Sequence, residues 1–411
     1  MESEILDFWV RRLSPLVVDE PPAEKMFHAR DPQVVAERLM LFFESGDNLK
    51  KHLRTHAGFA PNSTQAADIA ACLSQAREFL RISRAADLSI RPITLYYGMA
   101  ALAKALVLSF GNPKLLASLP PSHGLRAPSS FGVPMESLDV RANGNDGLFH
   151  RFVDSLSHRE HMIAEIRKVG KLRIWTKLSD SSQLTGFRTS LKALLTRIEG
   201  LEDFIRETFD ETPMNAPVEF NLARFGADQK ESESWNPQAS LVFRLPKGED
   251  EKWVRSLHPR LRDWRFRDDT GNLGDSLRGV AVFENLPPSL SPRPTGIFEQ
   301  GPLLRPLSDL TIPLTRGVQG DLRLIASVGN ITIPEPAIQL AAAFLLSTIA
   351  RYRPDIWSTF SSFSPNQKDS RLRALIEAFL DRASSVFPVQ VLAALARTSV
   401  VVWDGRPVMF A

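Results

Sequence analysis

The chain contains very little cysteine and tyrosine. Cys72 is the only cysteine in 411 residues, and there are only three tyrosines. A single cysteine excludes an intrachain disulfide framework and a zinc site built from cysteines, and it is typical of a reducing compartment. We therefore expect a cytoplasmic protein. Cys72 lies in an apolar stretch, where we expect it to be a small buried side chain.

The sequence also lacks the short motifs of common catalytic sites. It has no Gly-x4-Gly-Lys-Ser/Thr, no Gly-x-Gly-x-x-Gly, no His-Glu-x-x-His and no Gly-x-Ser-x-Gly. His158 and His161 have no evident third metal ligand, so we predict neither a metal site nor a cofactor. The net charge of +3 is small for this length. A polyanionic partner must therefore be argued from local clusters of charge.

No segment reads as a signal peptide or a membrane anchor. The first residues are acidic and lack an apolar run followed by a small-residue cleavage site. The longest apolar run, residues 93–110, has about the minimum length of a membrane span. A lysine at its centre would be costly in lipid. We therefore expect a core helix and no membrane partner.

This apolar run belongs to the most informative segment, residues 88–111. The segment is almost wholly apolar, with Lys104 as the charge in its middle. Pro92 suits the first turn of a helix, and Gly111 suits the position just past its end. A helix that is apolar on every side is buried.

Hydrophobic periodicity divides the chain into three regions. We predict an N-terminal helical region (1–211), a β-rich segment (212–336) and a C-terminal helical region (337–411) that packs on the first. The predicted helices are 33–44, 64–83, 93–110, 148–169, 188–208, 335–360, 370–386 and 388–396. The predicted strands are 218–222, 240–245, 279–283, 310–314, 322–328 and 398–403. The fold class is α+β, with a mainly helical core formed by N- and C-terminal helices and an inserted β-rich segment.

Several segments carry a family resemblance. Residues 89–93 (Ser-Ile-Arg-Pro-Ile), 95–99 (Leu-Tyr-Tyr-Gly-Met) and 102–105 (Leu-Ala-Lys-Ala) resemble the signature of the YaaC-like proteins, a bacterial family without an established biochemical role. The similarity continues at 122–125 (Ser-His-Gly-Leu), 145–149, 350–357 (Ala-Arg-Tyr-Arg-Pro-Asp-Ile-Trp) and 387–388. It spans roughly residues 79 to 388 and implies a cytoplasmic bacterial protein, but it carries no mechanism.

The first candidate site lies on the apolar helix and the loop after it. Its members are Arg91, Tyr96, Tyr97, Lys104 and His123. A lysine in such a helix must reach the surface, pair with a carboxylate or line a polar cavity. Tyr97 and Lys104 are seven residues apart and share one helix face. Together with the imidazole they would bind an anion such as a phosphate. The alternative is that Lys104 reaches solvent and His123 caps a turn.

The second candidate is the pair Arg151 and His158. Its spacing falls within the Arg-x4–6-His motif of HEPN ribonucleases, in which one group moves the 2′-hydroxyl proton and the other stabilises charge on the phosphate. About two such pairs are expected by chance in this composition. Phe152 also replaces the polar residue that usually follows the arginine.

The third candidate is an arginine-rich segment interleaved with aromatic residues. Its predicted nucleic-acid-binding residues are Arg255, Arg260, Arg262, Trp264, Arg265 and Arg267. Guanidinium groups pair with phosphates and aromatic rings stack on bases. The alternative is a solvated face whose charge is balanced by neighbouring aspartates.

These candidates leave three hypotheses for the function. The first is a nucleic-acid- or nucleotide-binding module that acts with partner proteins in phage defence. The second is a metal-independent HEPN-like ribonuclease that uses Arg151 and His158. The third is a scaffold subunit of a protein complex.

Overall fold

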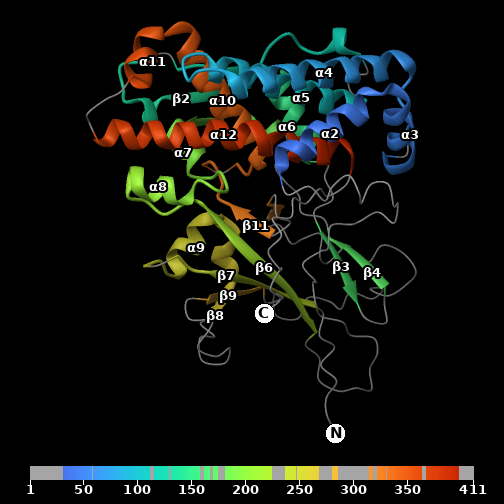
Figure 1. The fold of residues 1–411 in the computed structure, drawn as a ribbon. Coiled ribbons are helices and arrows are strands. Elements are labelled where there is room, and N and C mark those ends of the chain that lie inside the picture. The colour runs from blue at the N-terminus through green and yellow to red at the C-terminus, as the bar shows by residue number, and fades with distance from the viewer. Residues whose placement is uncertain are drawn as a thin grey trace. The chain divides into compact units, whose positions relative to one another are not determined.

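The computed structural model describes fourteen stretches of the chain (Figure 1). They are residues 31–57, 59–111, 115–128, 131–157, 162–166, 170–174, 181–224, 237–246, 248–267, 280–285, 314–317, 322–329, 331–362 and 367–397. They belong to two compact units. The helical unit draws on Pro15–Arg159, Ser179–Pro213 and Ile331–Ala411, and the sheet unit on Glu160–Leu178 and Met214–Asn330. The predicted strand 398–403 lies outside the described residues.

The helical unit contains segments from both ends of the chain. Its helices are α2 (Pro32–Glu44), α3 (Gly46–Ala57), α4 (Ser63–Ala85), α5 (Arg91–Ser109), α6 (Leu148–Ser157), α7 (Leu191–Leu195), α8 (Glu202–Phe209), α10 (Glu335–Tyr352), α11 (Pro354–Ser361) and α12 (Gln367–Leu395). A small antiparallel sheet orders β1 (Leu125–Arg126), β2 (Asp139–Ala142) and β5 (Arg188–Ser190).

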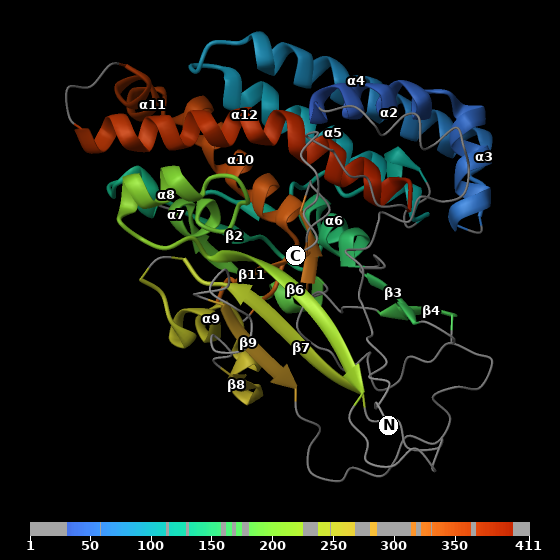
Figure 2. The same cartoon turned by 60° about the horizontal axis from the view of Figure 1, so that its bottom comes forward.

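Helix α5 forms the centre of this unit. It packs against α4, α6, α10 and α12, and Figure 2 shows α10 and α12 beside it. Leu95, Met99, Leu102 and Leu106 are fully buried. Proline occupies the first turn, and the glycine after the helix has φ +74°, as the sequence predicts. Residues from the two ends of the chain therefore share one hydrophobic core.

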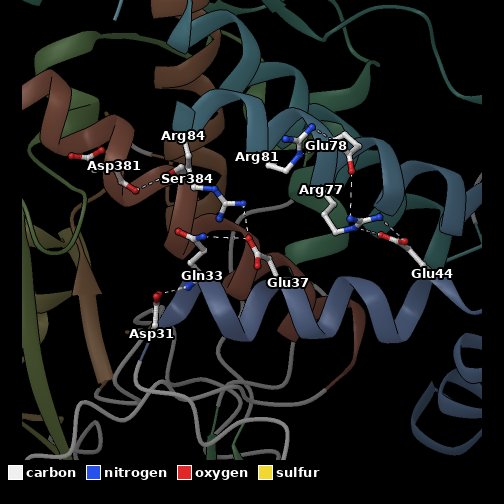
Figure 3. Close-up of polar contacts among 10 residues, drawn as sticks. All are labelled: Asp31, Gln33, Glu37, Glu44, Arg77, Glu78, Arg81, Arg84, Asp381 and Ser384. Atoms are coloured by element: carbon white, nitrogen blue, oxygen red, sulfur yellow. Dashed lines mark hydrogen bonds and ion pairs between the residues drawn. The ribbon is translucent and has the colours of Figure 1, made fainter. Parts of the chain in front are cut away.

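Ion pairs accompany the packing of α2 on α4 (Figure 3). Arg77 of α4 pairs with Glu44 of α2 at 2.8 Å, and Arg84 pairs with Glu37 at 2.9 Å. The side chain of Asp31 caps α2 by accepting from the backbone N–H of Gln33. These half-buried pairs align the two helices, while the apolar face of α2 supplies the burial.

The sheet unit is built around six antiparallel strands. Their order is β10 (Leu314–Arg316), β11 (Leu322–Ile325), β6 (Asn215–Arg224), β7 (Pro237–Arg244), β9 (Val280–Asn285) and β8 (Arg265–Arg267). The central β6–β7 pair matches residue 218 with 243 and residue 224 with 237. The unit also contains α9 (Glu251–Leu257) and the hairpin of β3 (Met162–Ile166) with β4 (Gly170–Ile174).

The predicted α+β class with a mainly helical core is confirmed, but three helix predictions are wrong in extent. The predicted helix 148–169 ends at residue 157, and its second half contains strand β3. The predicted helix 188–208 is instead β5, α7 and α8. The predicted helix 335–360 breaks at Arg353, because a residue before proline disfavours helical backbone. Conversely, α12 continues through Pro388, although proline has no backbone N–H to donate. Its neighbours Phe387 and Val389 are buried, and this packing maintains the helix.

Among the residues that the structure describes, two helices have the length and composition of a membrane span. They are Arg91–Ser109 and Asp369–Leu395, and 78% of each apolar window is buried inside the structure. Their apolar surface is therefore largely in contact with other parts of the same chain.

Two glycines hold the 122–124 loop against the start of α6. The backbone N–H of Leu148 donates to the carbonyl of Ser122, and that of Phe149 donates to the carbonyl of His123, both at 3.0 Å. Gly124 has φ +73° and Gly147 has φ +155°. A Cβ on Gly147 would lie 2.5 Å from the Cα of Gly124. Only glycine allows this approach of the two backbones.

Replacing Gly147 by alanine is expected to destabilise the helical unit by about 3 kcal/mol, because backbone strain and a clash with backbone add together. Gly144→Ala is the matched control, since Gly144 also has positive φ but a Cβ added there would meet nothing within 4 Å. The control should cost about 1 kcal/mol. Chemical denaturation of both variants measures the difference. Equal losses would show that steric contact with Gly124 contributes nothing.

Candidate functional site

Helix α5 buries Tyr96 beneath the loop that carries His123. Tyr96 is 1% exposed, and its hydroxyl lies 2.7 Å from Nδ1 of His123. Phe344 of α10 contacts both rings, with centroids 5.5 Å from Tyr96 and 5.8 Å from His123. His123 itself is exposed. The pair therefore joins a buried phenol to an imidazole that faces solvent.

The adjacent residue, Tyr97, reaches the surface and meets α10. Its ring stacks on Phe79 with centroids 5.7 Å apart, and its hydroxyl accepts a hydrogen bond of 2.9 Å from Nη1 of Arg351. The Arg351 guanidinium carbon lies 5.6 Å from the Tyr97 ring centroid and 5.1 Å from that of Tyr352. Tyr97 is 37% exposed and Tyr352 is 67% exposed. We refer to Tyr97, Arg351 and Tyr352 as the Arg351–tyrosine stack.

A second arginine–aromatic contact comes from the neighbouring residue Arg353. Its guanidinium carbon lies 5.2 Å from the ring centroid of Phe131, and its Nη2 is 2.6 Å from a carboxylate oxygen of Asp355. Trp357 anchors the same segment, because its Nε1 donates to the carbonyl of Leu88 just before α5. The segments that carry the family resemblance at 89–99 and 350–357 are thus in contact, through Arg351 and Tyr97.

Burial and nearby cations shift the pKa values of Tyr96 and His123. Burial raises the pKa of the Tyr96 hydroxyl, although the charge of Arg351 opposes the shift. Partial burial lowers the pKa of His123, and the charges of Arg351 and Lys104 lower it further. At neutral pH, Tyr96 therefore stays protonated and His123 stays uncharged.

The structure brings together some members of the first predicted site and separates one. Tyr96, Tyr97 and His123 are in contact, with tyrosine ring centroids 5.8 Å apart. Lys104 lies on the same helix and acts on His123 through its charge. Arg91 instead pairs with Asp381 of α12 at 2.5 Å.

Sequence reasoning missed Arg351, Tyr352 and Phe344 as members of this site. Arg351 and Tyr97 are 254 residues apart, so no local spacing connects them. The available signal was the position of Arg351 and Tyr352 within a segment that carries the family resemblance.

Of the predicted ribonuclease pair, the structure describes Arg151 and not His158. Arg151 forms a two-point ion pair with Asp146, with both nitrogen–oxygen distances 2.9 Å. His158 lies outside the described residues, and α6 ends at residue 157. In the described part of the chain, no three His, Cys, Asp or Glu side chains are placed to hold a metal ion.

The arginine-rich segment of the sheet unit is engaged internally. Arg255 pairs with Glu251 and donates to the backbone carbonyls of Leu261, Arg262 and Trp264. These bonds tie α9 to the short 3₁₀ helix Pro259–Asp263. Trp264 is 7% exposed, so its ring presents no open face.

The remaining arginines of that segment divide into two groups. Arg260 and Arg262 are exposed. Arg265 and Arg267 lie on strand β8, but their side chains are outside what the structure describes.

His258 is the buried polar residue of the same segment. Its Nδ1 accepts from the backbone N–H of Arg260 at 3.2 Å and caps the 3₁₀ helix. Burial, aided by the charge of Arg260, lowers the pKa of His258 to about 4. Between this value and the ordinary histidine value of about 6.5, the unfolded chain binds the proton and the folded chain does not.

Acidification is therefore expected to destabilise the sheet unit through His258. Because the folded pKa lies below the unfolded one, stability falls as the pH drops from 6.5 to 4. His258→Asn keeps a capping oxygen and removes the titration. Between pH 6.5 and 4, the free energy of unfolding of this variant should fall by about 2 kcal/mol less than that of the unaltered chain. Urea denaturation at several pH values measures both; parallel curves would contradict the assignment.

Comparison with known proteins places this chain in a family. No curated protein and no solved structure matches it. A family model described as YaaC-like Protein matches residues 41–395, which includes α5, the His123 loop and the Arg351 segment. The chain belongs to the YaaC-like protein family.

Proposed function

We propose that this YaaC-like protein is a nucleic-acid- or nucleotide-binding module that takes single-stranded nucleic acid on the Arg351–tyrosine stack. The observation that carries the proposal is the guanidinium of Arg351 held against two exposed tyrosine rings. Aromatic faces stack on bases of any sequence, and a guanidinium adds a planar positive charge that pairs with phosphates.

Arg351 keeps donors available for such a ligand. Its Nε donates to the carbonyl of Ser347 and its Nη1 to the hydroxyl of Tyr97. Within the described stretches, Arg351 forms no ion pair with a carboxylate. The two internal bonds orient the guanidinium while its charge remains uncompensated by a direct partner, which favours an anionic ligand.

The helical unit supports nucleic-acid binding better than the arginine-rich segment does. The guanidinium of Arg255 donates to backbone carbonyls within its own segment, and Trp264 is buried. Arg260 and Arg262 are exposed and would add only positive charge. The aromatic surface of the helical unit combines charge with accessible ring faces.

The other hypotheses have less support. The guanidinium of Arg151 is engaged by Asp146, which would have to release it before it could stabilise a scissile phosphate. Protein partners, a scaffold role and action in phage defence stay predictions.

Binding of a fluorescently labelled 12-nucleotide single-stranded RNA, measured by anisotropy, tests the proposal. Tyr352→Ala should weaken binding about tenfold, because one stacked base contributes about 1–3 kcal/mol. Arg351→Gln should also weaken binding and reduce the slope of log K against log salt by about 0.7, since one phosphate contact is lost.

Phe204→Ala and Arg206→Gln serve as matched controls on α8, because both side chains are exposed. The controls should bind as the unaltered chain does. Equal losses in controls and site variants, or no RNA binding at all, would contradict the proposal. Gel analysis of the same RNA detects cleavage; cutting that disappears in His158→Ala would favour the ribonuclease instead.

A further inference from the structure

The hydrogen bond beneath the Arg351–tyrosine stack determines where His123 carries its proton. The Tyr96 hydroxyl is buried and protonated, and Nδ1 of His123 is its partner in the described structure, at 2.7 Å. A buried hydroxyl without an acceptor for its hydrogen is costly. Tyr96 therefore donates to Nδ1, and the proton of the neutral imidazole resides on Nε2.

This tautomer makes the exposed side of His123 a hydrogen-bond donor. Partial burial and two nearby cations keep the imidazole uncharged at neutral pH. With Nδ1 occupied by Tyr96, the remaining nitrogen presents an N–H. A histidine in this state binds an acceptor such as a phosphate oxygen, and it has no free lone pair with which to remove a proton.

Lys104 and Arg351 supply positive charge around the same imidazole. Lys104 is seven residues after Tyr97 on α5, so the two residues share one face of the helix. Its charge acts on His123, as does that of Arg351. Across the described ranges, Lys104 has no hydrogen bond or ion pair. Arg351 lies on the same tyrosine pair as His123, because it bonds the Tyr97 hydroxyl while His123 bonds that of Tyr96, and the two tyrosine ring centroids are 5.8 Å apart.

We infer that His123, Lys104 and Arg351 form a receptor for a phosphate group esterified to a nucleoside, with Tyr96 as the residue that positions His123. The inference deepens the proposed function and rests on it, because the attached base would stack on Tyr352. The receptor uses only donors: Nε2–H of His123, the ammonium of Lys104 and the guanidinium of Arg351. It binds the phosphate and performs no chemistry on it.

Isothermal titration of the full chain with AMP, adenosine and inorganic phosphate tests the receptor. AMP should bind at least tenfold more tightly than adenosine, because only AMP carries the phosphate. Lys104→Gln and His123→Ala should each weaken AMP binding about fivefold or more and leave adenosine binding unchanged. Lys50→Gln is the matched control, because Lys50 lies on a different helix, α3, and its ammonium donates to the hydroxyl of Ser63.

A spectroscopic measurement tests the positioning role of Tyr96 separately. Long-range ¹H–¹⁵N correlation of the imidazoles should find the Nε2–H form of His123, and Tyr96→Phe should shift the ring toward a mixture of tautomers. Tyr96→Phe keeps the ring that packs against Phe344, and circular dichroism verifies folding. An Nδ1–H tautomer in the unaltered protein would overturn the inference.

The titration and the RNA-binding experiment together show which of the two proposals, the receptor or the proposed function, is overturned. If the 12-nucleotide RNA binds and depends on Tyr352, but Lys104→Gln and His123→Ala leave AMP and RNA binding unchanged, the receptor is overturned and the proposed function stands. If inorganic phosphate binds in a Lys104-dependent manner while AMP and RNA gain nothing from their bases, the anion site stands and its assignment to nucleotides is overturned.

Discussion

The burial of most of the apolar surface of α5 is the constraint on which the helical unit depends. Exposing the apolar residues of a helix of this length to water would have a large free-energy cost, so other helices must cover most of its surface. The chain meets this requirement with α4 and α6 from its first half and α10 and α12 from its last part. Residues that are far apart in the sequence consequently come together around one helix.

The same constraint determines where the polar groups of α5 can find hydrogen-bond partners. Tyr96 is buried within the helix packing, and its hydroxyl reaches the His123 loop. At the other end, the carbonyl of Leu108 accepts from the side chain of Gln65. Because a buried polar group must be hydrogen-bonded, the core itself dictates that a loop with a hydrogen-bonding residue lies over Tyr96. The candidate site is thus a consequence of how α5 is buried.

Two arginine–aromatic segments with similar composition have different roles in the structure. In the sheet unit, Arg255 uses its guanidinium to join a helix to the turn that follows, and Trp264 is packed inside. In the helical unit, Arg351 keeps its charge at the surface between two tyrosine rings. Composition predicts an affinity for phosphates and bases in both segments, but only exposure and hydrogen bonding distinguish a structural arginine from an available one.

The sequence by itself determined the local features of this protein. The apolar run, Pro92 and Gly111 specified α5 and both of its ends, and alternating β-branched runs indicated β6, β7 and β9, because these signals lie within a few residues of one another. The break before Pro354 and the passage of α12 through Pro388 required the full structure, since burial overrides local preference at one site and not at the other. Only the tertiary structure decided that Arg351 stands beside Tyr97 and that Tyr96 orients His123. Such contacts depend on how distant segments pack around a common core, and no spacing along the chain encodes that packing.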